Sequence, residues 1–247
     1  MRAFTSLFRS MWRTNLRDAS TLVFSFAFPV VLFVFLASQF GDLAGVDGHL
    51  VVDSIGPNVI AFGTAFVGMF AAATNLVEWR KNGMMQVLRA TPVKVSTILG
   101  AQVAVGMVLA LVQLVVLVLV GVSPWVGMSL SPWAPLATIG VLQGTIVFFA
   151  LGILVGMIAP SVPAASMAIL VMILPMGYVS GAMMPVDMLP DWAAALAAWM
   201  PLHYLLDAVA GPLTGVVGLT GTLLGLGLLG AFGLILFSAA TKTMRWS

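Results

Sequence analysis

Long apolar stretches separated by short polar segments make up most of this 247-residue chain. A helix that spans a bilayer needs about 20 mainly apolar residues, and six stretches meet that requirement. None of them contains Asp, Glu, Lys or Arg in its interior. The pattern predicts six transmembrane helices, at residues 21–40, 58–77, 95–122, 135–158, 163–183 and 214–239.

Composition narrows the class of protein further. The chain is 61% hydrophobic and only 7% charged, with a mean hydropathy of +1.13, whereas soluble domains carry roughly 25% charged residues. We therefore expect one all-α integral membrane domain over residues 1–247. The absence of cysteine excludes disulfides and thiolate metal sites. No GxxxxGK[ST] or HExxH motif occurs, so neither a catalytic ATPase site nor a metal site is predicted.

The charged residues predict the orientation of the spans. Lys and Arg favour cytoplasmic loops, and a six-span arrangement with both termini inside places all ten basic residues there. A five- or seven-span arrangement would put some of them outside. The basic residues are Arg2, Arg9, Arg13, Arg17, Arg80, Lys81, Arg89, Lys94, Lys242 and Arg245, and the outer loops would hold Asp42, Asp47, Asp53, Asp187, Asp191 and Asp207.

Residues 1–18 have the pattern of an amphipathic helix. Phe4, Phe8 and Trp12 recur at helical spacing on one face, and Arg9 and Arg13 lie on the other. Such a helix lies in the membrane interface, with its apolar face at the acyl boundary and its arginines at lipid headgroups. The alternative is a plain topology signal, which needs the charges but leaves the aromatic stripe unexplained.

Two further segments do not span. Residues 78–94, EWRKNGMMQVLRATPVK, predict a short cytoplasmic helix, after which Thr91 caps the next helix and Pro92 takes its first position. The alternative is a solvated basic loop. On the outer side, residues 184–212 predict two short apolar helices between prolines, too short to span. They form a re-entrant or interfacial hairpin or, alternatively, an interfacial loop.

Polar and aromatic residues within the spans allow two interpretations. Gln113 and Gln143 could contact a substrate, or could bond to neighbouring helices. Phe62, Phe66 and Phe70 form a stripe that could line a hydrophobic route or face lipid. The spans lack the buried charges that ion-coupled carriers use, so any transport would need energy from another protein.

Two motifs resemble those of ABC-2 type transporter permeases, of the drug-resistance kind. The first motif joins the second and third spans and consists here of Glu78, Arg80, Gly83, Leu88, Thr91 and Pro92, with Trp79 and Gln86 as departures from the usual pattern. The second precedes the last span and consists of Ser180, Gly181, Pro185, Leu189, Pro190, Trp192, Pro201, Leu202, His203 and Asp207.

The resemblance implies a dimeric exporter in the bacterial plasma membrane. The second permease would be the same chain or a sibling, and two copies of a separate cytoplasmic ATPase would bind ATP and Mg, with no cofactor on this chain. Residues 1–18 would be a connecting helix in contact with membrane lipids. Residues 78–92, including Gln86 and Arg89, would form the coupling helix on the ATPase, and residues 184–212 would cap the exit path.

The function that this resemblance implies is the outward movement of an amphipathic small molecule, such as a drug, an antibiotic or a lipid, by a permease subunit without an ATPase site of its own. No nucleic-acid partner is expected. The alternative is a self-sufficient channel or secondary carrier, which would need charged or water-lined helices.

Overall fold

The structure is a computed structural model that describes residues 2–15, 17, 19–45, 48–83, 95–183 and 189–243. Within these ranges the chain is helical and forms no strand, apart from an isolated bridge between Ala44 and Leu50. Six helices are long and apolar enough to cross a membrane. This result confirms the all-α membrane fold predicted from the apolar stretches.

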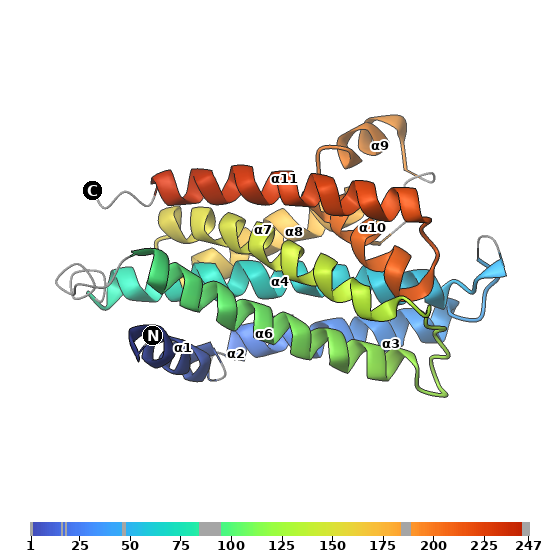
Figure 1. The fold of residues 1–247 in the computed structure, drawn as a ribbon, viewed down its shortest axis with the longest axis horizontal. Helices are drawn as coiled ribbons and strands as arrows, with labels where there is room; N and C mark the ends of the chain where they lie inside the picture. Colours follow the sequence, from blue (N-terminus) through green and yellow to red (C-terminus); the bar gives the residue numbers. More distant parts are fainter. Residues whose placement is uncertain are drawn as a thin grey trace.

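The helices form an elongated bundle (Figure 1). In chain order they are α1 (Arg2–Asn15), α2 (Ala19–Leu22), the π-helix η1 (Val23–Ala27), α3 (Phe28–Phe40), α4 (Val52–Lys81), α6 (Val95–Gly121), the 3₁₀-helix η3 (Ala134–Leu136), α7 (Ala137–Ile158), α8 (Val162–Val179), α9 (Asp191–Ala197), α10 (Pro201–Thr214) and α11 (Leu219–Thr243).

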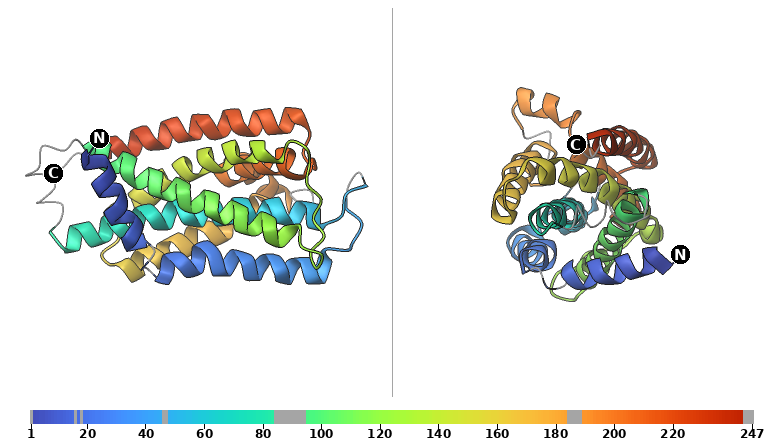
Figure 2. Two further views of the ribbon diagram at one scale, coloured as in Figure 1. Left: turned by 60° about the horizontal axis from the view of Figure 1, so that its bottom comes forward. Right: turned by 90° about the vertical axis from the view of Figure 1, so that its left-hand side faces the viewer.

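Helix α1 and the end of α11 lie at one end of the bundle, here called the proximal end (Figure 1). The proximal end also holds the end of α4 and the connection from α7 to α8. The opposite, distal end holds α9 and the connections from α3 to α4 and from α6 to α7. Helix α1 lies across the bundle axis rather than along it (Figure 2).

Helix α4 is the centre of the protein. Helices α3, α6, α7, α8 and α10 all pack against it, and the end-on view shows it inside a ring of other helices (Figure 2). The most apolar part of α4 is buried completely, whereas the corresponding parts of the first span, of α8 and of α11 are only 22% buried. The outer helices therefore leave most of their apolar surface for lipid or for another protein.

Glycines let α7 approach α4 closely. A Cβ atom added at Gly152 would lie 2.5 Å from the carbonyl oxygen of Met69, and one added at Gly156 would lie 3.0 Å from the Cα of Ala73. Small residues of this kind allow backbones to meet within a membrane, where van der Waals packing drives helix association. The glycine pairs of α7 thus serve contacts within the protein.

Helix α4 begins six residues earlier than the predicted span 58–77, at Val52. The reason is Asp53, which hydropathy places in an outer loop but which is buried in the first turn of α4. Its carboxylate accepts hydrogen bonds from the backbone N–H of Ser129 (2.8 Å) and of Leu50 (3.3 Å), and the ring of His49 lies 3.7 Å away. These partners allow a carboxylate to be buried at the distal end.

The first span contains a π-helical turn, η1, between α2 and α3. A π-turn widens the helix and changes which backbone carbonyls are paired within it. The carbonyl of Ser25 in this turn accepts a hydrogen bond of 2.7 Å from the Nε2 of Gln113 on α6. Gln113 therefore joins two spans, as the interhelical interpretation of this residue predicted.

Candidate functional site

The proximal end of α4 carries the most specific polar contact of the described chain. Nη1 of Arg80 donates hydrogen bonds to the carbonyl oxygens of Gly156 (2.9 Å), Met157 (2.7 Å) and Ala159 (3.2 Å). These carbonyls belong to the last turn of α7 and to the residue after it. The last carbonyls of a helix have no partner within the helix, and a cation there also complements the helix dipole. Arg80 therefore caps α7 from α4.

The structure describes the predicted coupling helix only as far as Gly83. Glu78 lies in the last turn of α4 and is partly buried, and Lys81 beside it is exposed. Gly83 follows the end of α4 with φ of +66°, a conformation that favours glycine after a helix. Residues 84–94, with the predicted site residues Gln86, Leu88, Arg89, Thr91 and Pro92, lie outside the described residues.

The separate coupling helix predicted over 78–92 needs a correction at its start. Glu78 and Arg80 belong to α4, which continues without a break to Lys81. Hydropathy ends the span at residue 77 because the following residues are polar. The helix itself extends beyond the apolar region because Arg80 finds its partners on α7. Residues 84–94 thus follow the end of the central helix closely in the sequence.

Three buried amides attach α1 and α6 to the same end of α4. Nδ2 of Asn75 donates to Oδ1 of Asn15 (3.4 Å) and to the carbonyl oxygen of Ala71 (2.8 Å). Nε2 of Gln102 on α6 donates to the same Ala71 oxygen at 2.9 Å. Asn15 and Asn75 were not among the predicted site residues. The signal for Asn75 was an amide side chain near the end of a predicted span, whereas no pattern marked Asn15.

The predicted interfacial face of α1 contacts the bundle as well as the surroundings. Phe8 and Trp12 are half-buried and stack with ring centroids 6.3 Å apart. Phe4 is exposed, as are the opposite-face residues Arg9 and Arg13. Because α1 packs on α6, a displacement of either helix would also displace the other.

The phenylalanine stripe of α4 forms core, and this corrects both interpretations that were drawn from the sequence. Phe62, Phe66 and Phe70 are at most 2% exposed, so in this structure they face neither lipid nor an open route. Phe24 of η1 stacks on Phe70 with ring centroids 5.2 Å apart. Periodicity located the stripe, but it could not show that α4 has protein on every side.

Helices α9 and α10 meet at an angle of 74° in the outer segment predicted as a hairpin. Pro190 precedes α9, Pro201 begins α10, and Trp192 is exposed on α9. Helix α10 runs to Thr214, beyond the expected segment, and packs against α4, α7 and α11. Pro185 lies outside the described residues.

Helix α10 is tied to the end of α8. Nδ1 of His203 lies 3.1 Å from the carbonyl oxygen of Ser180, and Nδ2 of Asn58 on α4 donates to the carbonyl oxygen of Gly181 at 3.4 Å. Asp207 lies one turn after His203 and outside the six spans. Burial raises the pKa of the Asp207 carboxyl, and the nearby His203 acts in the opposite direction.

Among the described residues, no three His, Asp or Glu side chains gather in a way that could hold a metal ion. The contacts described above join the helices to one another. Arg80 joins α4 to α7, the amides join α4 to α1 and α6, and His203 joins α10 to α8. The links made by Arg80 and by Asn15 connect elements that are distant in the sequence.

Comparison with known proteins identifies the family of the chain. Residues 2–213 match the ABC-2 type transporter family. The chain is also 23% identical over 201 residues to a Bacillus subtilis (strain 168) protein named "Putative transport permease YvfS", and the alignment covers 76% of each chain. The family match includes both motifs found in the sequence and supports a role as a transport permease. The chain is a multi-pass membrane protein that belongs to the ABC-2 type transporter family.

Proposed function

We propose that this chain is the permease subunit of an ATP-driven exporter that moves an amphipathic small molecule outward across the bacterial plasma membrane. A separately encoded ATPase would supply the energy and bind ATP and Mg. The full complex would contain two ATPase copies and a second permease subunit. Family membership supports the transport role, and the observation that carries the mechanism is the Arg80 cap.

The Arg80 cap provides a route by which a displacement of residues 84–94 would be transmitted to the spans. These residues follow directly on α4, and the end of α4 is held to the end of α7 by three hydrogen bonds from Arg80. Close glycine packing continues the contact along both helices. A movement of the ATPase would thus displace α4 and α7 together, because packed helices shift as units rather than deform.

The same displacement would reach the distal end through α10. Helix α10 packs on both α4 and α7, and its His203 contacts the end of α8. A joint movement of α4 and α7 would therefore change how α10 sits on α8. In the proposed exporter this change opens the outer side of the path, where α9 and α10 lie.

The test of this function is reconstitution with an ATPase. Tagged permease would be co-expressed with an ATP-binding subunit encoded beside its gene, purified, and placed in proteoliposomes with a fluorescent amphipathic cation. We expect co-purification and ATP-dependent movement of the compound. Movement at the same rate without the ATPase would contradict the proposal and favour a self-sufficient carrier.

The orientation of the bundle gives a separate prediction. Described basic residues such as Arg9, Arg80 and Lys81 lie at the proximal end, which we assign to the cytoplasm under the positive-inside rule. The chain contains no cysteine, so single-cysteine variants can be labelled without background. Ser129 at the distal end and Asn82 at the proximal end are both exposed. An impermeant maleimide should label Ser129→Cys in intact cells and Asn82→Cys only after permeabilisation. The reverse pattern would overturn the assignment.

A further inference from the structure

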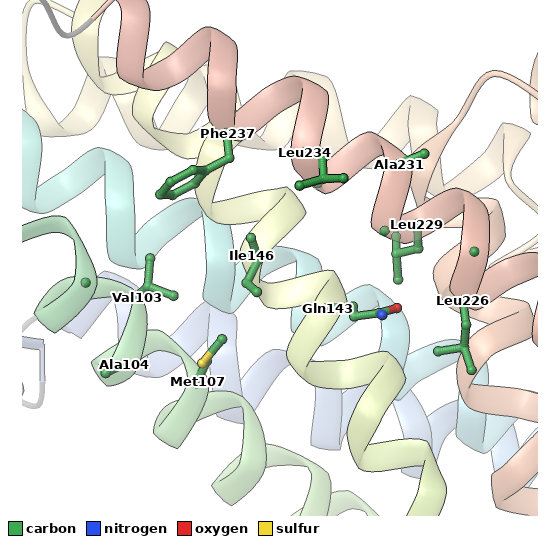
Figure 3. Close-up of a pocket in the computed structure, with 14 residues that line it drawn as sticks. Val103, Ala104, Met107, Gln143, Ile146, Leu226, Leu229, Ala231, Leu234 and Phe237 are labelled. Atoms are coloured by element: carbon green, nitrogen blue, oxygen red, sulfur yellow. The ribbon is translucent and has the colours of Figure 1, made fainter. Parts of the chain in front are cut away.

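A groove runs between α6, α7 and α11 on the side of the bundle. Both α6 and α11 pack on α7 but make little contact with each other, so the surface of α7 between them stays open (Figure 3). The groove has a volume of about 1000 Å³, which is at the upper end of the range for ligand pockets. It contains none of the residues that link α4 to its neighbours.

Missing side chains create much of this space. A Cβ atom added at Gly100, Gly227 or Gly230 would meet no atom within 4 Å, and all three residues line the groove. Gly225 on the same helix as the last two differs, because a Cβ there would lie 2.9 Å from the carbonyl oxygen of Tyr204. One face of α11 is therefore packed on α10, while its glycine face borders the open groove.

The groove runs along the bundle rather than across it. Its lining on α11 extends from Leu226 to Phe237, a length of roughly 16 Å at 1.5 Å per residue. The exposed side chain of Leu234 lies at its border. A slot of this length, parallel to the spans and open at the side, has the direction and the apolar walls that a lipid acyl chain requires.

One amide interrupts the apolar wall. Gln143 is the only lining residue with an oxygen or nitrogen in its side chain, and Figure 3 shows it between the side chains of α6 and α11. Its Oε1 is buried without a hydrogen-bond partner. An unpaired amide in an apolar environment costs free energy, and a lone water would need two to four polar partners. Because the Oε1 oxygen is out of reach from the groove, a ligand with a hydrogen-bond acceptor bonds to the other end of the amide, Nε2.

We propose that this groove binds one acyl chain of a membrane lipid, and that the amide of Gln143 bonds to a hydroxyl or amide group carried near that chain. Gln143 lies six residues into α7, about 9 Å from its distal end, so the polar group sits below the outer membrane surface. The chain then fills the space beside Gly227 and Gly230 and extends toward Phe237.

The experiment uses the full-length protein in nanodiscs with a photoactivatable lipid. The probe carries a diazirine on its acyl chain, and labelled peptides are mapped by mass spectrometry. We expect labelling to concentrate on α6 and α11 around Gly100 and Gly227. The double variant Gly227→Leu, Gly230→Leu fills the groove and should remove this labelling. A matched control, Val115→Phe, adds bulk on an exposed position of α6 outside the groove and should leave it unchanged.

Gln143→Leu tests the polar contact separately. Native mass spectrometry would compare binding of an N-acylated or hydroxylated lipid with binding of a lipid that has the same chain without that group. The wild-type protein should prefer the first by about three- to tenfold, the equivalent of one hydrogen bond, and Gln143→Leu should lose the preference but keep the chain. A melting curve confirms that each variant is folded.

Two results would overturn the proposal. Labelling spread evenly over the exposed faces of α3, α8 and α11 would show that the groove has no preference for lipid. Disulfide formation between two copies of Gly227→Cys, together with loss of labelling, would show that a second copy of the chain covers it. Neither readout depends on transport, so the outcome is independent of the proposed export function.

Discussion

Replacement of Gly152 by alanine is expected to lower the melting temperature of the purified protein clearly. The new Cβ would lie 2.5 Å from the Met69 carbonyl oxygen and 2.8 Å from the Met69 Cα. Both are backbone atoms of the central helix, so no flexible side chain can move aside. Overpacking of this kind costs about 1–3 kcal/mol. Fluorescence-detected melting in detergent measures the change.

The matched control is Gly227→Ala on α11, where a Cβ meets no atom within 4 Å. The two substitutions make the same chemical change in a helix, and alanine has the higher helix propensity, by about 1 kcal/mol. Gly227→Ala should therefore leave the melting temperature equal or higher. Equal melting temperatures of the two variants would show that α7 can move away from α4 at no cost in free energy. The close packing of these two helices would then not contribute to stability.

Replacement of Arg80 by glutamine is expected to separate ATP hydrolysis from transport. The variant loses the charged cap on the carbonyls of Gly156, Met157 and Ala159, and a hydrogen bond to a charged group contributes about 1.5–3 kcal/mol. In the reconstituted complex, ATP hydrolysis should continue while transport per ATP falls about tenfold. The ratio of the two rates, measured in the same proteoliposomes, is the readout.

Two variants separate charge from geometry in this test. Lys81→Gln removes the same charge from the adjacent, exposed position and should keep the wild-type ratio. Arg80→Lys keeps the charge, but its ammonium nitrogen ends one bond short of the Nη1 that makes all three contacts, so it should recover only part of the coupling. If Arg80→Gln and Lys81→Gln behave alike, net charge at the membrane surface matters and the α7 cap does not.

The sequence predicted the spans well because the bilayer imposes a simple requirement on length and hydropathy. Each of the six predicted stretches overlaps a helix of the structure, although α8 ends four residues before residue 183 and α11 begins five residues after residue 214. The errors concern partners that are distant in the chain. Asp53 belongs to α4 because Ser129 donates to it, and Arg80 extends the same helix because its acceptors lie on α7. Local patterns carry no information about such pairs.

The sequence predicted where the candidate site lies but not which contacts its residues make. The motif around Glu78 marked the correct end of α4, but the function of Arg80 as a helix cap needs the coordinates of Gly156. Periodicity likewise found the stripe of Phe62, Phe66 and Phe70. Whether such a stripe meets lipid, ligand or protein depends on the number of helices around it, and this is a tertiary property.

The central position of α4 has a consequence for how the protein is made. The ribosome completes α4 about 130 residues before α10, which is on the order of ten seconds at usual synthesis rates. During this time the middle of the helix lies in lipid with three polar side chains. Thr64, Thr74 and Asn75 each bond to a carbonyl four residues earlier on α4 itself. The middle of the helix thus satisfies these polar groups before its later neighbours exist, whereas Asp53 and Asn58 near its start gain partners only when Ser129 and Gly181 have been made.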